Sequence, residues 1–336
     1  MLNLIQCFSF IVLNSLILIY FNFFSKYFNL FDIPNQYRKK QVKPISLFGG
    51  FIFVINFSLF LFFDIFFNFN VFESFFGLNS HIKLYSFIFI FYTVYLIGYA
   101  DDKFDLRPFS KIILVTICLY LVINNNQALV INSIRSNFLT REIDLYFIGP
   151  YFTILCIVCF MNAMNMFDGV NLVSFLQFFL IGTVLLIDNK IFIFSLVLLF
   201  SLFVFGYLNL KNLSFLGDSG VYVLAFISGI ILIALYKNNN LNVEEILILI
   251  YLPMLDFFRL FFSRIYKGNS PFLPDENHLH HLLIKKLKFK NTLLVIFLLL
   301  YFPVILNYLL DLTYLVLLVF VTIYFILLYK LKKKTN

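Results

Sequence analysis

The sequence predicts an all-α polytopic membrane protein, with residues 1–336 forming one integral-membrane domain. Hydrophobic residues make up 62% of the chain and charged residues only 12%, and the mean hydropathy is +0.95. An ordinary soluble domain is about half apolar and about a quarter charged. The composition therefore excludes a soluble globular protein. All four cysteines lie inside apolar runs, so we expect them to pack between helices rather than to form disulfides.

The apolar runs give the number of membrane spans. A spanning helix needs about 20 apolar residues, and fewer where neighbouring helices bury its ends. No Lys or Arg precedes or interrupts the first run, so we expect a retained first span rather than a cleaved signal peptide. We expect about eleven transmembrane helices, at residues 4–24, 47–67, 84–100, 110–124, 146–162, 172–188, 190–208, 219–236, 243–263, 292–310 and 313–330.

The distribution of positive charge predicts the orientation, because Lys and Arg concentrate in cytoplasmic loops. If the N-terminus is outside and the C-terminus is cytoplasmic, most of the 25 Lys and Arg residues face the cytoplasm. The net charge of +8 then lies at a membrane surface, and we expect no nucleic-acid partner. The basic residues left on the outside are Lys83, Arg135, Arg141, Lys190 and Lys237.

Five polar stretches interrupt the apolar pattern, and each follows an odd-numbered span. Because all five fall on the cytoplasmic side, they predict a single composite site at that edge of the membrane. A channel or transporter would carry its polar groups near mid-membrane, on broken helices. The stretches are DIPNQYRKKQVKPISLFGG (32–50), DDKFDLRPFSK (101–111), NAMNMFDGVN (162–171), FLGDSG (215–220) and SPFLPDENHLHHLL (270–283).

Two of these stretches carry acids in unusual settings. Asp101 and Asp102 are adjacent, and adjacent helical side chains point about 100° apart. The pair therefore predicts two separate roles rather than one chelating face. Asp218 lies between glycines in GDSG, where the backbone can approach a ligand and loop amides can meet phosphate. A solvated helix end and a tight turn are the structural alternatives.

Amides and imidazoles mark two further stretches. Asn162 and Asn165 are three residues apart on one helical face, where hydrogen bonding between helices is the alternative to ligand binding. Three of the four histidines fall in HLHH, as His278, His280 and His281. A structural zinc site is disfavoured because no cysteine is near, whereas imidazoles beside Lys, Arg and acids fit phosphate handling. A basic amphipathic surface segment is the alternative.

Taken in order, these motifs resemble those of the polyprenyl-phosphate N-acetylhexosamine-1-phosphate transferases (glycosyltransferase family 4). The likeness runs from about Asp32 to Leu283. It is strongest toward the bacterial undecaprenyl-phosphate GlcNAc-1-phosphate transferases, and the phospho-MurNAc-pentapeptide transferases are related. The segments that favour the GlcNAc-1-phosphate branch are DIPNQYRKK, SPFLPDENHLHHLL and LDFFRLFFSRIYKG.

The resemblance implies a reaction and a location. N-acetylhexosamine-1-phosphate would pass from a UDP-sugar, expected to be UDP-GlcNAc, to undecaprenyl or another polyprenyl phosphate. UMP would be released, and a cell-envelope glycan such as O-antigen or teichoic acid would be initiated. The protein would be a multi-pass protein of the bacterial inner (cytoplasmic) membrane with its active site on the cytoplasmic face. Because the lipid stays in the bilayer and the nucleotide stays outside it, the active site has to lie at the edge of the membrane.

The resemblance also implies roles for individual residues. Asp101 and Asp102 match paired acids that position or deprotonate the lipid phosphate, and Asp168 is the third expected catalytic residue. Mg²⁺, or Mn²⁺ in its place, would bind Asp218 and Asn165, which suits an ion that takes one or two protein oxygens. The expected substrate-binding residues are Lys111 on phosphate, Asn171 on the nucleotide side, His278, His280 and His281 on the sugar diphosphate, and the basic pair Arg38 and Lys39.

Departures from the family pattern leave several points open. Gln41 stands where bacterial members often have His, and Asn171 and Leu172 replace Asp and Gly. These changes leave other UDP-HexNAc donors and UDP-MurNAc-pentapeptide as alternatives, together with an inactive family member. More distant are a lipid or sugar transporter, which needs mid-membrane charges, and an intramembrane aspartyl protease, whose G-x-G-D motif would need Gly at Phe215. Polyprenyl length, the pathway served and the oligomeric state, including a homodimer, are undecided by the sequence.

Overall fold

The computed structural model describes residues 2–34, 43–138, 141–186, 191–272 and 275–333. The chain is predominantly helical, as predicted. Strands β1 (Phe31–Asp32) and β2 (Ile45–Ser46) pair antiparallel, as do β3 (Ser133–Ile134) and β4 (Ile143–Asp144). The helices are α1 (Leu2–Ile19), α2 (Phe21–Phe28), α3 (Gly49–Phe66), α4 (Val71–Phe76), α5 (His81–Phe104), α6 (Pro108–Asn125), α7 (Gly149–Phe167), α8 (Val173–Leu185), α9 (Phe192–Leu210), α10 (Gly217–Lys237), α11 (Val243–Tyr266), α12 (Leu279–Lys286), α13 (Phe289–Leu310) and α14 (Thr313–Lys333).

Within the described residues, nine helices are long and apolar enough to cross a membrane, and each overlaps a predicted span. The first predicted span instead divides into α1 and α2, which meet at a 71° bend. The predicted span 172–188 is α8, which has 13 residues and is short for a bilayer. It packs against α9 and α13. By length and composition, the described residues thus contain nine helices that could each cross a membrane, or ten with the bent pair, and the predicted count of eleven is not confirmed.

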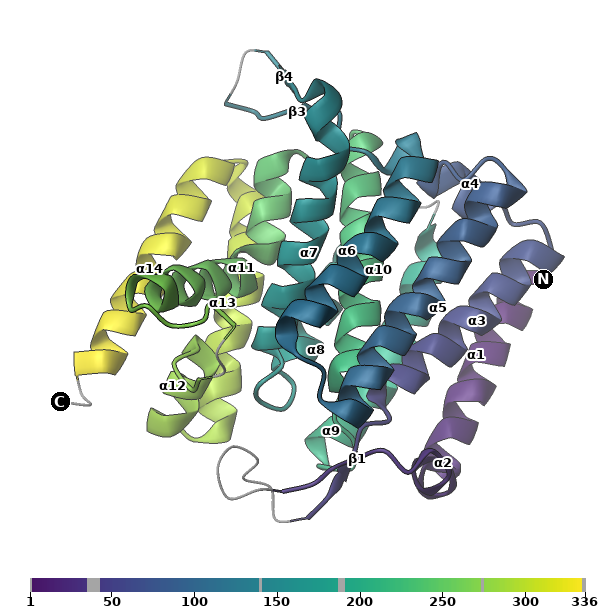
Figure 1. Cartoon of the computed structure of the whole chain (residues 1–336), viewed down its shortest axis with the longest axis horizontal. Helices are drawn as coiled ribbons and strands as arrows, with labels where there is room; N and C mark the ends of the chain where they lie inside the picture. Colours follow the sequence, from purple (N-terminus) through teal and green to yellow (C-terminus); the bar gives the residue numbers. More distant parts are fainter. Residues whose placement is uncertain (1, 35–42, 139–140, 187–190, 273–274, 334–336) are drawn as a thin grey trace.

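Helix α10 forms the centre of the bundle and is buried from Ser219 to Tyr236, mainly against α5, α7 and α3 (Figure 1). Glycines allow close approach at its first turn. A Cβ added at Gly50 of α3 would lie 2.6 Å from the backbone nitrogen of Gly220, and one added at Gly98 of α5 would collide with the Ser219 backbone. Small residues let helix backbones meet in this way. The C-terminal end of α5 is thereby held beside the N-terminal turn of α10.

Two helices contain an internal proline whose missing hydrogen bond is replaced by a neighbour. Proline has no backbone N–H, so the carbonyl four residues earlier loses its helical partner. For Pro253 of α11 that carbonyl belongs to Leu249, which accepts a hydrogen bond from the Gln177 side chain of α8 at 2.8 Å. For Pro303 of α13 it belongs to Leu299, which accepts one from the Tyr251 hydroxyl at 2.6 Å. Satisfying these carbonyls matters where no water is available.

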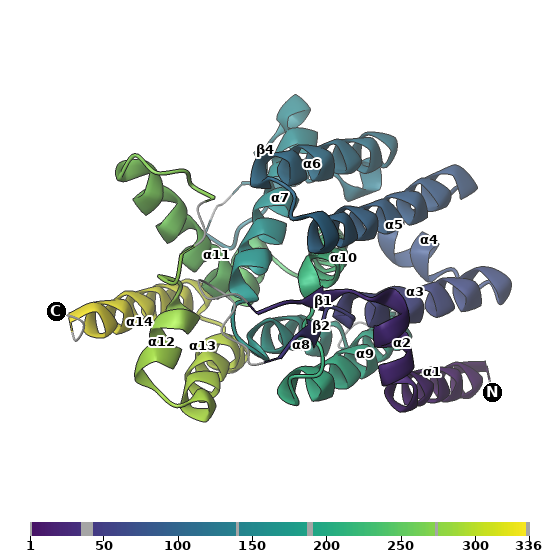
Figure 2. The same cartoon turned by 60° about the horizontal axis from the view of Figure 1, so that its bottom comes forward.

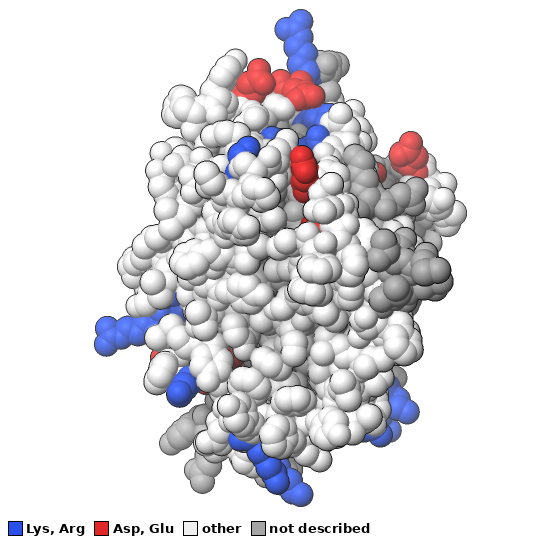
Figure 3. Space-filling view, turned by 90° about the vertical axis from the view of Figure 1, so that its right-hand side faces the viewer, with Lys and Arg blue, Asp and Glu red and all other residues white. Residues whose placement is uncertain are grey.

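Charged and irregular segments gather at the two ends of the bundle. The β3–β4 hairpin lies at one end, whereas β1, α2 and α12 lie at the opposite end (Figure 1). The latter end comes forward in Figure 2, where β1 and β2 lie across the front of the bundle. Figure 3 shows Lys, Arg, Asp and Glu mostly toward the two ends of one face, with mainly uncharged surface between them. Such a surface is what a bilayer-spanning protein presents to lipid.

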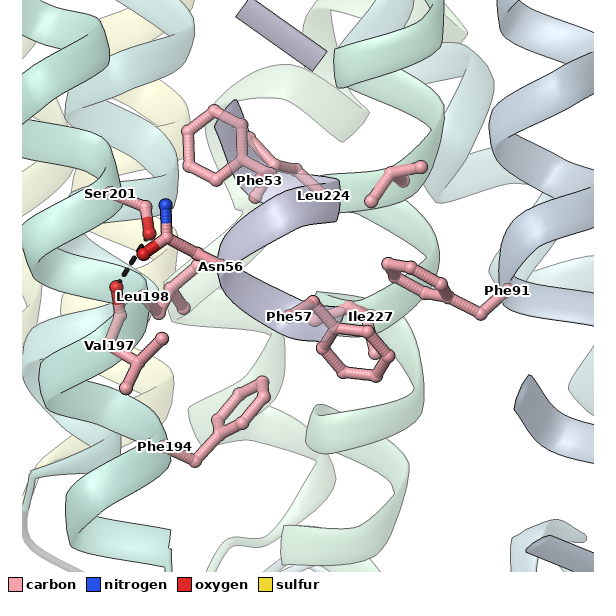
Figure 4. A pocket seen from close by; sticks show the side chains of 11 residues that line it. Phe53, Asn56, Phe57, Phe91, Phe194, Val197, Leu198, Ser201, Leu224 and Ile227 are labelled. Atoms are coloured by element: carbon pink, nitrogen blue, oxygen red, sulfur yellow. Dashed lines mark hydrogen bonds between the residues drawn. The ribbon is translucent and has the colours of Figure 1, made fainter. Parts of the chain in front are cut away.

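A cavity inside the bundle lies between α3, α5, α9 and α10 (Figure 4). Its polar side chains already have partners. Ser201 donates to the Val197 carbonyl at 2.8 Å, and the Asn56 amide pairs with that of Asn14 at 2.8 and 3.1 Å. None of the predicted site residues lines this cavity, so it is a feature of packing. The apolar lining consists of Phe53, Phe57, Phe91, Phe194, Val197, Leu198, Val223, Leu224 and Ile227.

Candidate functional site

Four helix ends bring together the acids, the lysine and the amide that the sequence singled out. Lys111, in the first turn of α6, forms an ion pair with Asp101, in the last turn of α5. The same ammonium lies 3.4 Å from Oδ2 of Asp218, in the first turn of α10. Asn165, near the end of α7, donates its amide to Oδ1 of Asp218 at 2.6 Å. Two carboxylates thus share one cation, and the Asp218 side chain remains 33% exposed.

The two adjacent acids have different partners, as helical geometry predicts. Asp101 is 4% exposed and accepts a hydrogen bond from the backbone nitrogen of Leu106 at 2.8 Å, besides its pairing with Lys111. Asp102 instead accepts the backbone N–H groups of Asp218 at 2.7 Å and Ser219 at 3.0 Å. It therefore caps the N-terminus of α10 from another helix, where a carboxylate stabilises the free N–H groups and the helix dipole.

This cap changes the interpretation of GDSG. The sequence made its loop amides candidates for binding phosphate, but Asp102 occupies the N–H groups of Asp218 and Ser219. Gly217 has a positive φ of 73°, and a Cβ there would lie 2.8 Å from the Asp102 carboxylate. The glycine is required by the turn and by this close approach. The motif therefore presents the Asp218 side chain, rather than its backbone, to the site.

Asp168 and Asn171 follow α7 and face different neighbours. Asp168 accepts a hydrogen bond from the Ser174 hydroxyl. Burial raises the pKa of Asp168 to about 7, and although the Ser174 hydrogen bond lowers it, the nearby negative charges of Asp218 and Asp102 raise it further. Asn171 donates to the carbonyl of Asn209 at 2.9 Å and to the side-chain oxygen of Asn212 at 2.7 Å. Its amide thus ties the loop after α7 to the end of α9.

The three predicted histidines form one cluster against the turn that follows α7. The His280 and His281 rings are 4.3 Å apart, and a Cβ added at Gly169 would collide with His280 and lie 2.7 Å from Nε2 of His281. His280 is fully buried, and both its ring nitrogens lack a partner in the structure. Burial lowers the pKa of His280 well below its usual range, and burial together with His278 lowers that of His281 to about 4. Both imidazoles are neutral at pH 7.

His278 leads to residues that the sequence interpretation did not assign. Its Nδ1 lies 2.8 Å from Oδ2 of Asp256, a buried acid within α11. Arg259 donates to Oδ1 of Asp256 at 2.7 Å, and the Tyr324 hydroxyl of α14 donates to the same atom at 2.6 Å. The sequence could have indicated Asp256 and Arg259, because an acid and an arginine inside the span at 243–263 are unusual. Nothing local marked Tyr324, which lies far along the chain.

Two predicted residues cannot be placed, and one ion pair supports the loop before the histidines. Arg38 and Lys39 lie outside the described residues. Arg264 of α11 is 3.1 Å from Asp275 and donates to the Pro271 carbonyl at 2.7 Å. The guanidinium of Arg264 lowers the pKa of Asp275 despite partial burial, which raises it. The segment that precedes HLHH is therefore tied to α11.

The residues around Asp218 fit a divalent cation. Among the residues that the structure describes, no group of three or more His, Cys, Asp or Glu could hold a metal ion. Mg²⁺ commonly binds through one or two protein oxygens plus substrate phosphates, and Asp218 offers a partly exposed carboxylate. The Asn165 amide, which now donates to Asp218, would present its oxygen after a side-chain flip. With two carboxylates beside one ammonium, added positive charge is electrostatically favourable.

Comparison with known proteins shows which family the central region of this chain is similar to. Residues 84–236 match the model of "Glycosyl transferase family 4". Several relatives carry the name undecaprenyl-phosphate alpha-N-acetylglucosaminyl 1-phosphate transferase. That of Haemophilus influenzae is 27% identical over 282 residues, covering 78% of this chain and 73% of the relative.

Two further relatives with that name agree. That of Pasteurella multocida is 26% identical over 272 residues, covering 76% of this chain and 71% of the relative. That of Escherichia coli is 28% identical over 204 residues, covering 56% of this chain and 55% of the relative. The matched family region contains Asp101, Asp102, Lys111, Asp168 and Asp218. Through this central region the chain is similar to glycosyl transferase family 4, and the relatives are named as transferases.

Proposed function

We propose that this chain transfers GlcNAc-1-phosphate from UDP-GlcNAc to undecaprenyl phosphate and releases UMP. The reaction would depend on Mg²⁺ and take place at the cytoplasmic face of a bacterial inner membrane. The observation that carries the proposal is the placement of Lys111 between Asp101 and Asp218, beside Asn165. The names of the relatives support GlcNAc-1-phosphate as the group transferred and undecaprenyl phosphate as its acceptor.

The chemistry requires two anions to react with each other. An oxygen of the lipid phosphate attacks the phosphorus that bears the sugar, and a new phosphoanhydride bond forms. The bond between the two phosphates of the donor breaks, and UMP leaves with the bonding electrons. Catalysis of such a transfer is mostly positioning and charge neutralisation. Mg²⁺, when bound, supplies positive charge beside the donor diphosphate.

The lipid phosphate is expected to lie beside Lys111. A phosphate monoester has its second pKa near about 6, so it is mostly ionised at neutral pH and needs a cation more than a base. Asp101 holds the ammonium of Lys111 in place through their ion pair. We therefore assign Lys111 to phosphate binding and Asp101 to orienting it, while Asp102 fixes the backbone that carries Asp218.

The donor is expected to lie between Asp218 and the histidine cluster. Asp218 and Asn165 would hold the cation on the diphosphate, and Asp168 with Asn171 would line the nucleotide side. His281 is the most accessible of the three predicted imidazoles, since His278 and His280 are buried. A neutral imidazole can still donate one N–H to a phosphate or sugar oxygen.

A direct assay tests the proposed reaction. Purified protein is mixed with undecaprenyl phosphate, Mg²⁺ and a panel of UDP-sugars: UDP-GlcNAc, UDP-GalNAc and UDP-MurNAc-pentapeptide. We expect release of UMP and formation of a lipid diphosphate sugar with UDP-GlcNAc in particular. Preference for another donor would correct the sugar. Absence of UMP with every donor would show that this chain is not an active transferase.

Thiol labelling tests the orientation. Asp144→Cys on the β3–β4 hairpin and Lys290→Cys in α13 both place a thiol at an exposed position, in a background without the native cysteines. An impermeant thiol reagent added to intact cells should label the hairpin cysteine and spare the one at position 290. The reverse labelling pattern would show that the orientation is inverted and that the proposed site faces the outside.

A further inference from the structure

A buried charged centre lies outside the group around Asp218. Asp256 is 1% exposed and lies inside α11, a helix apolar enough to span the membrane. A buried carboxylate is costly unless it is fully hydrogen-bonded and paired, and ionisable groups in membrane spans are commonly functional. The contacts of Asp256 therefore indicate what its charge is used for.

The contacts of Asp256 join three separate segments. Oδ1 accepts from Arg259 at 2.7 Å and from the Tyr324 hydroxyl of α14 at 2.6 Å. Oδ2 meets Nδ1 of His278 at 2.8 Å, and both oxygens lie 3.3 Å from the backbone nitrogen of Leu279, the first residue of α12. One carboxylate thus fixes the side chain that precedes α12 and caps the start of that helix.

Arg259 and Tyr324 complete the arrangement. The guanidinium of Arg259 donates to the Tyr324 hydroxyl at 2.8 Å and to the Asn277 carbonyl at 2.8 Å. Tyr324 is fully buried, and its hydroxyl links α14 to Asp256. The segment from Asn277 to Leu279 is therefore held from both α11 and α14.

This hold reaches the proposed donor site through the histidine rings. His278 and His280 stack with centroids 5.5 Å apart and an interplanar angle of 12°, and His280 lies 4.3 Å from His281. The latter two rings meet Gly169, next to Asp168. A shift of His278 would therefore displace the rings that pack against the turn after α7, because close-packed groups transmit displacement.

We propose that Asp256 and Tyr324 are positioning residues, which hold the histidine segment against the Asp168–Gly169 turn and thereby determine the affinity for the nucleotide-sugar donor. The inference rests on the proposed function for the identity of that donor. It assigns a role in the site to α14, which lies outside the matched family region. Neither side chain touches the substrate in this proposal.

The test compares two tyrosines of α14. Tyr324→Phe removes the buried hydroxyl and keeps the ring, whereas Tyr329→Phe makes the same change at a side chain that is 66% exposed. We expect Tyr324→Phe to raise the KM for UDP-GlcNAc about tenfold, the scale of one hydrogen bond to a charged group. The KM for the lipid phosphate should stay within about twofold, and Tyr329→Phe should match the wild type.

A second readout does not require turnover. Diethyl pyrocarbonate modifies accessible imidazoles, and mass spectrometry gives the rate for each histidine. Tyr324→Phe and Asp256→Asn should both speed the modification of His278 several-fold, and binding of UDP-GlcNAc, measured by calorimetry, should weaken in parallel. Tyr329→Phe should change neither quantity. These measurements remain informative if the wild type proves to have no transferase activity, which would contradict the proposed function alone.

Three outcomes would overturn the positioning role. One is an unchanged donor KM and unchanged His278 modification in Tyr324→Phe. Another is an equal rise in the KM values for donor and lipid, which would indicate a general loss of structure. The third is a faster His278 modification with no change in donor affinity, since the histidine segment would then move without consequence for donor binding.

Discussion

The two ends of the bundle each carry a cluster of polar and charged side chains, and the clusters differ in how their charges are balanced. At the hairpin end, Arg135 donates to Asn242 at 2.9 Å, to Asn239, and to the carbonyls of Tyr236 and Leu241 at 2.8 and 3.0 Å. Its guanidinium also lies 4.8 Å from the Tyr236 ring. This cation is surrounded by acceptors, so the network ties the hairpin to the α10–α11 loop.

At the opposite end the balance is incomplete. Asp101 and Asp218 share the single ammonium of Lys111, and Asp218 is also the most exposed carboxylate of that pair. Two ionised carboxylates beside the same ammonium repel each other, and a further cation would reduce this repulsion. The difference teaches that hydrogen bonding alone does not distinguish a functional cluster from a structural one. A functional cluster is marked instead by an accessible carboxylate that has too little positive charge beside it. This criterion can be tested by mutation.

Asp218 should give the largest effect. Asp218→Ala removes the full negative charge among the proposed cation ligands, and metal-ion stabilisation is worth several kcal/mol of a transition state. We expect turnover to fall by at least about 10³-fold, with little recovery at high Mg²⁺ or Mn²⁺. The assay is UMP release, with thermal unfolding as a check on folding. Wild-type turnover and metal dependence would place the cation elsewhere.

Asn165→Ala is the matched variant at the same site. It removes a neutral amide, so the loss should be smaller and partly recovered by added metal. Asp144→Asn, at an exposed position on the hairpin, should leave turnover unchanged. Equal losses in Asn165→Ala and Asp218→Ala would contradict the view that charge, rather than local packing, is what matters here.

The next largest effects should come from Asp101 and Asp102, and the two substitutions should change the kinetics differently because the partners of the two acids differ. Asp101→Asn removes the shorter of the two ion pairs of Lys111, and we expect at least about 10²-fold slower turnover with a higher KM for the lipid phosphate. Asp102→Asn keeps one acceptor oxygen for the α10 N-terminus, so it should cost less than Asp102→Ala. Steady-state kinetics with varied lipid and donor would measure this. Identical kinetic changes in Asp101→Asn and Asp102→Asn would refute the division of roles.

The sequence predicted which residues form this site better than it predicted their hydrogen-bond and ion-pair partners. Asp101, Lys111, Asn165 and Asp218 were assigned from motif order, and the structure brings them together. The cap formed by Asp102 was not predictable, because it depends on how closely α5 approaches α10. Nothing local in GDSG reveals that a side chain from 116 residues away takes its amides.

Other differences have the same physical origin. The run 172–188 was predicted as one span, and its helix α8 has only 13 residues and packs against α9 and α13. Hydropathy identifies the apolar run but does not give the length of the helix within it, because that length depends on packing. Likewise Asp256 could be noticed as an acid within a span, but its partner Tyr324 is 68 residues away. Pairings over such separations are set by tertiary packing.

At the hairpin end, substitution of Arg135 should lower the stability of the fold and leave turnover unchanged. Arg135→Ala removes several hydrogen bonds, and Arg135→Lys should not restore them because an ammonium lacks the planar fork of donors. We expect a loss of about 1–3 kcal/mol, seen as a melting temperature lower by a few degrees. Turnover per folded molecule should stay at the wild-type value. A selective loss of turnover would mean that the two ends are coupled.

The smallest effect should come from Asp168, and its sign is set by pH. Burial raises its pKa from the ordinary 3.8 to about 7, so the folded protein holds a proton there that the unfolded chain has released. The contribution of Asp168 to stability therefore falls as pH rises from about 4 to about 7. Asp168→Asn cannot ionise and still accepts the Ser174 hydrogen bond. The melting temperature of the variant minus that of the wild type should therefore grow by a few degrees between pH 5 and pH 8.

Metal-free buffer with a chelator is essential to this measurement, because a bound cation would stabilise the ionised carboxylates. Ser174→Ala provides a second check: removing the hydrogen bond that lowers the pKa of Asp168 should move the pH window upward. A difference that is flat with pH, or that shrinks as pH rises, would mean that Asp168 keeps its charge in the folded protein. The charge imbalance at this end of the bundle would then be larger than the Asp101–Lys111–Asp218 group alone indicates, and Asp168 would have to be counted among the groups that attract the cation.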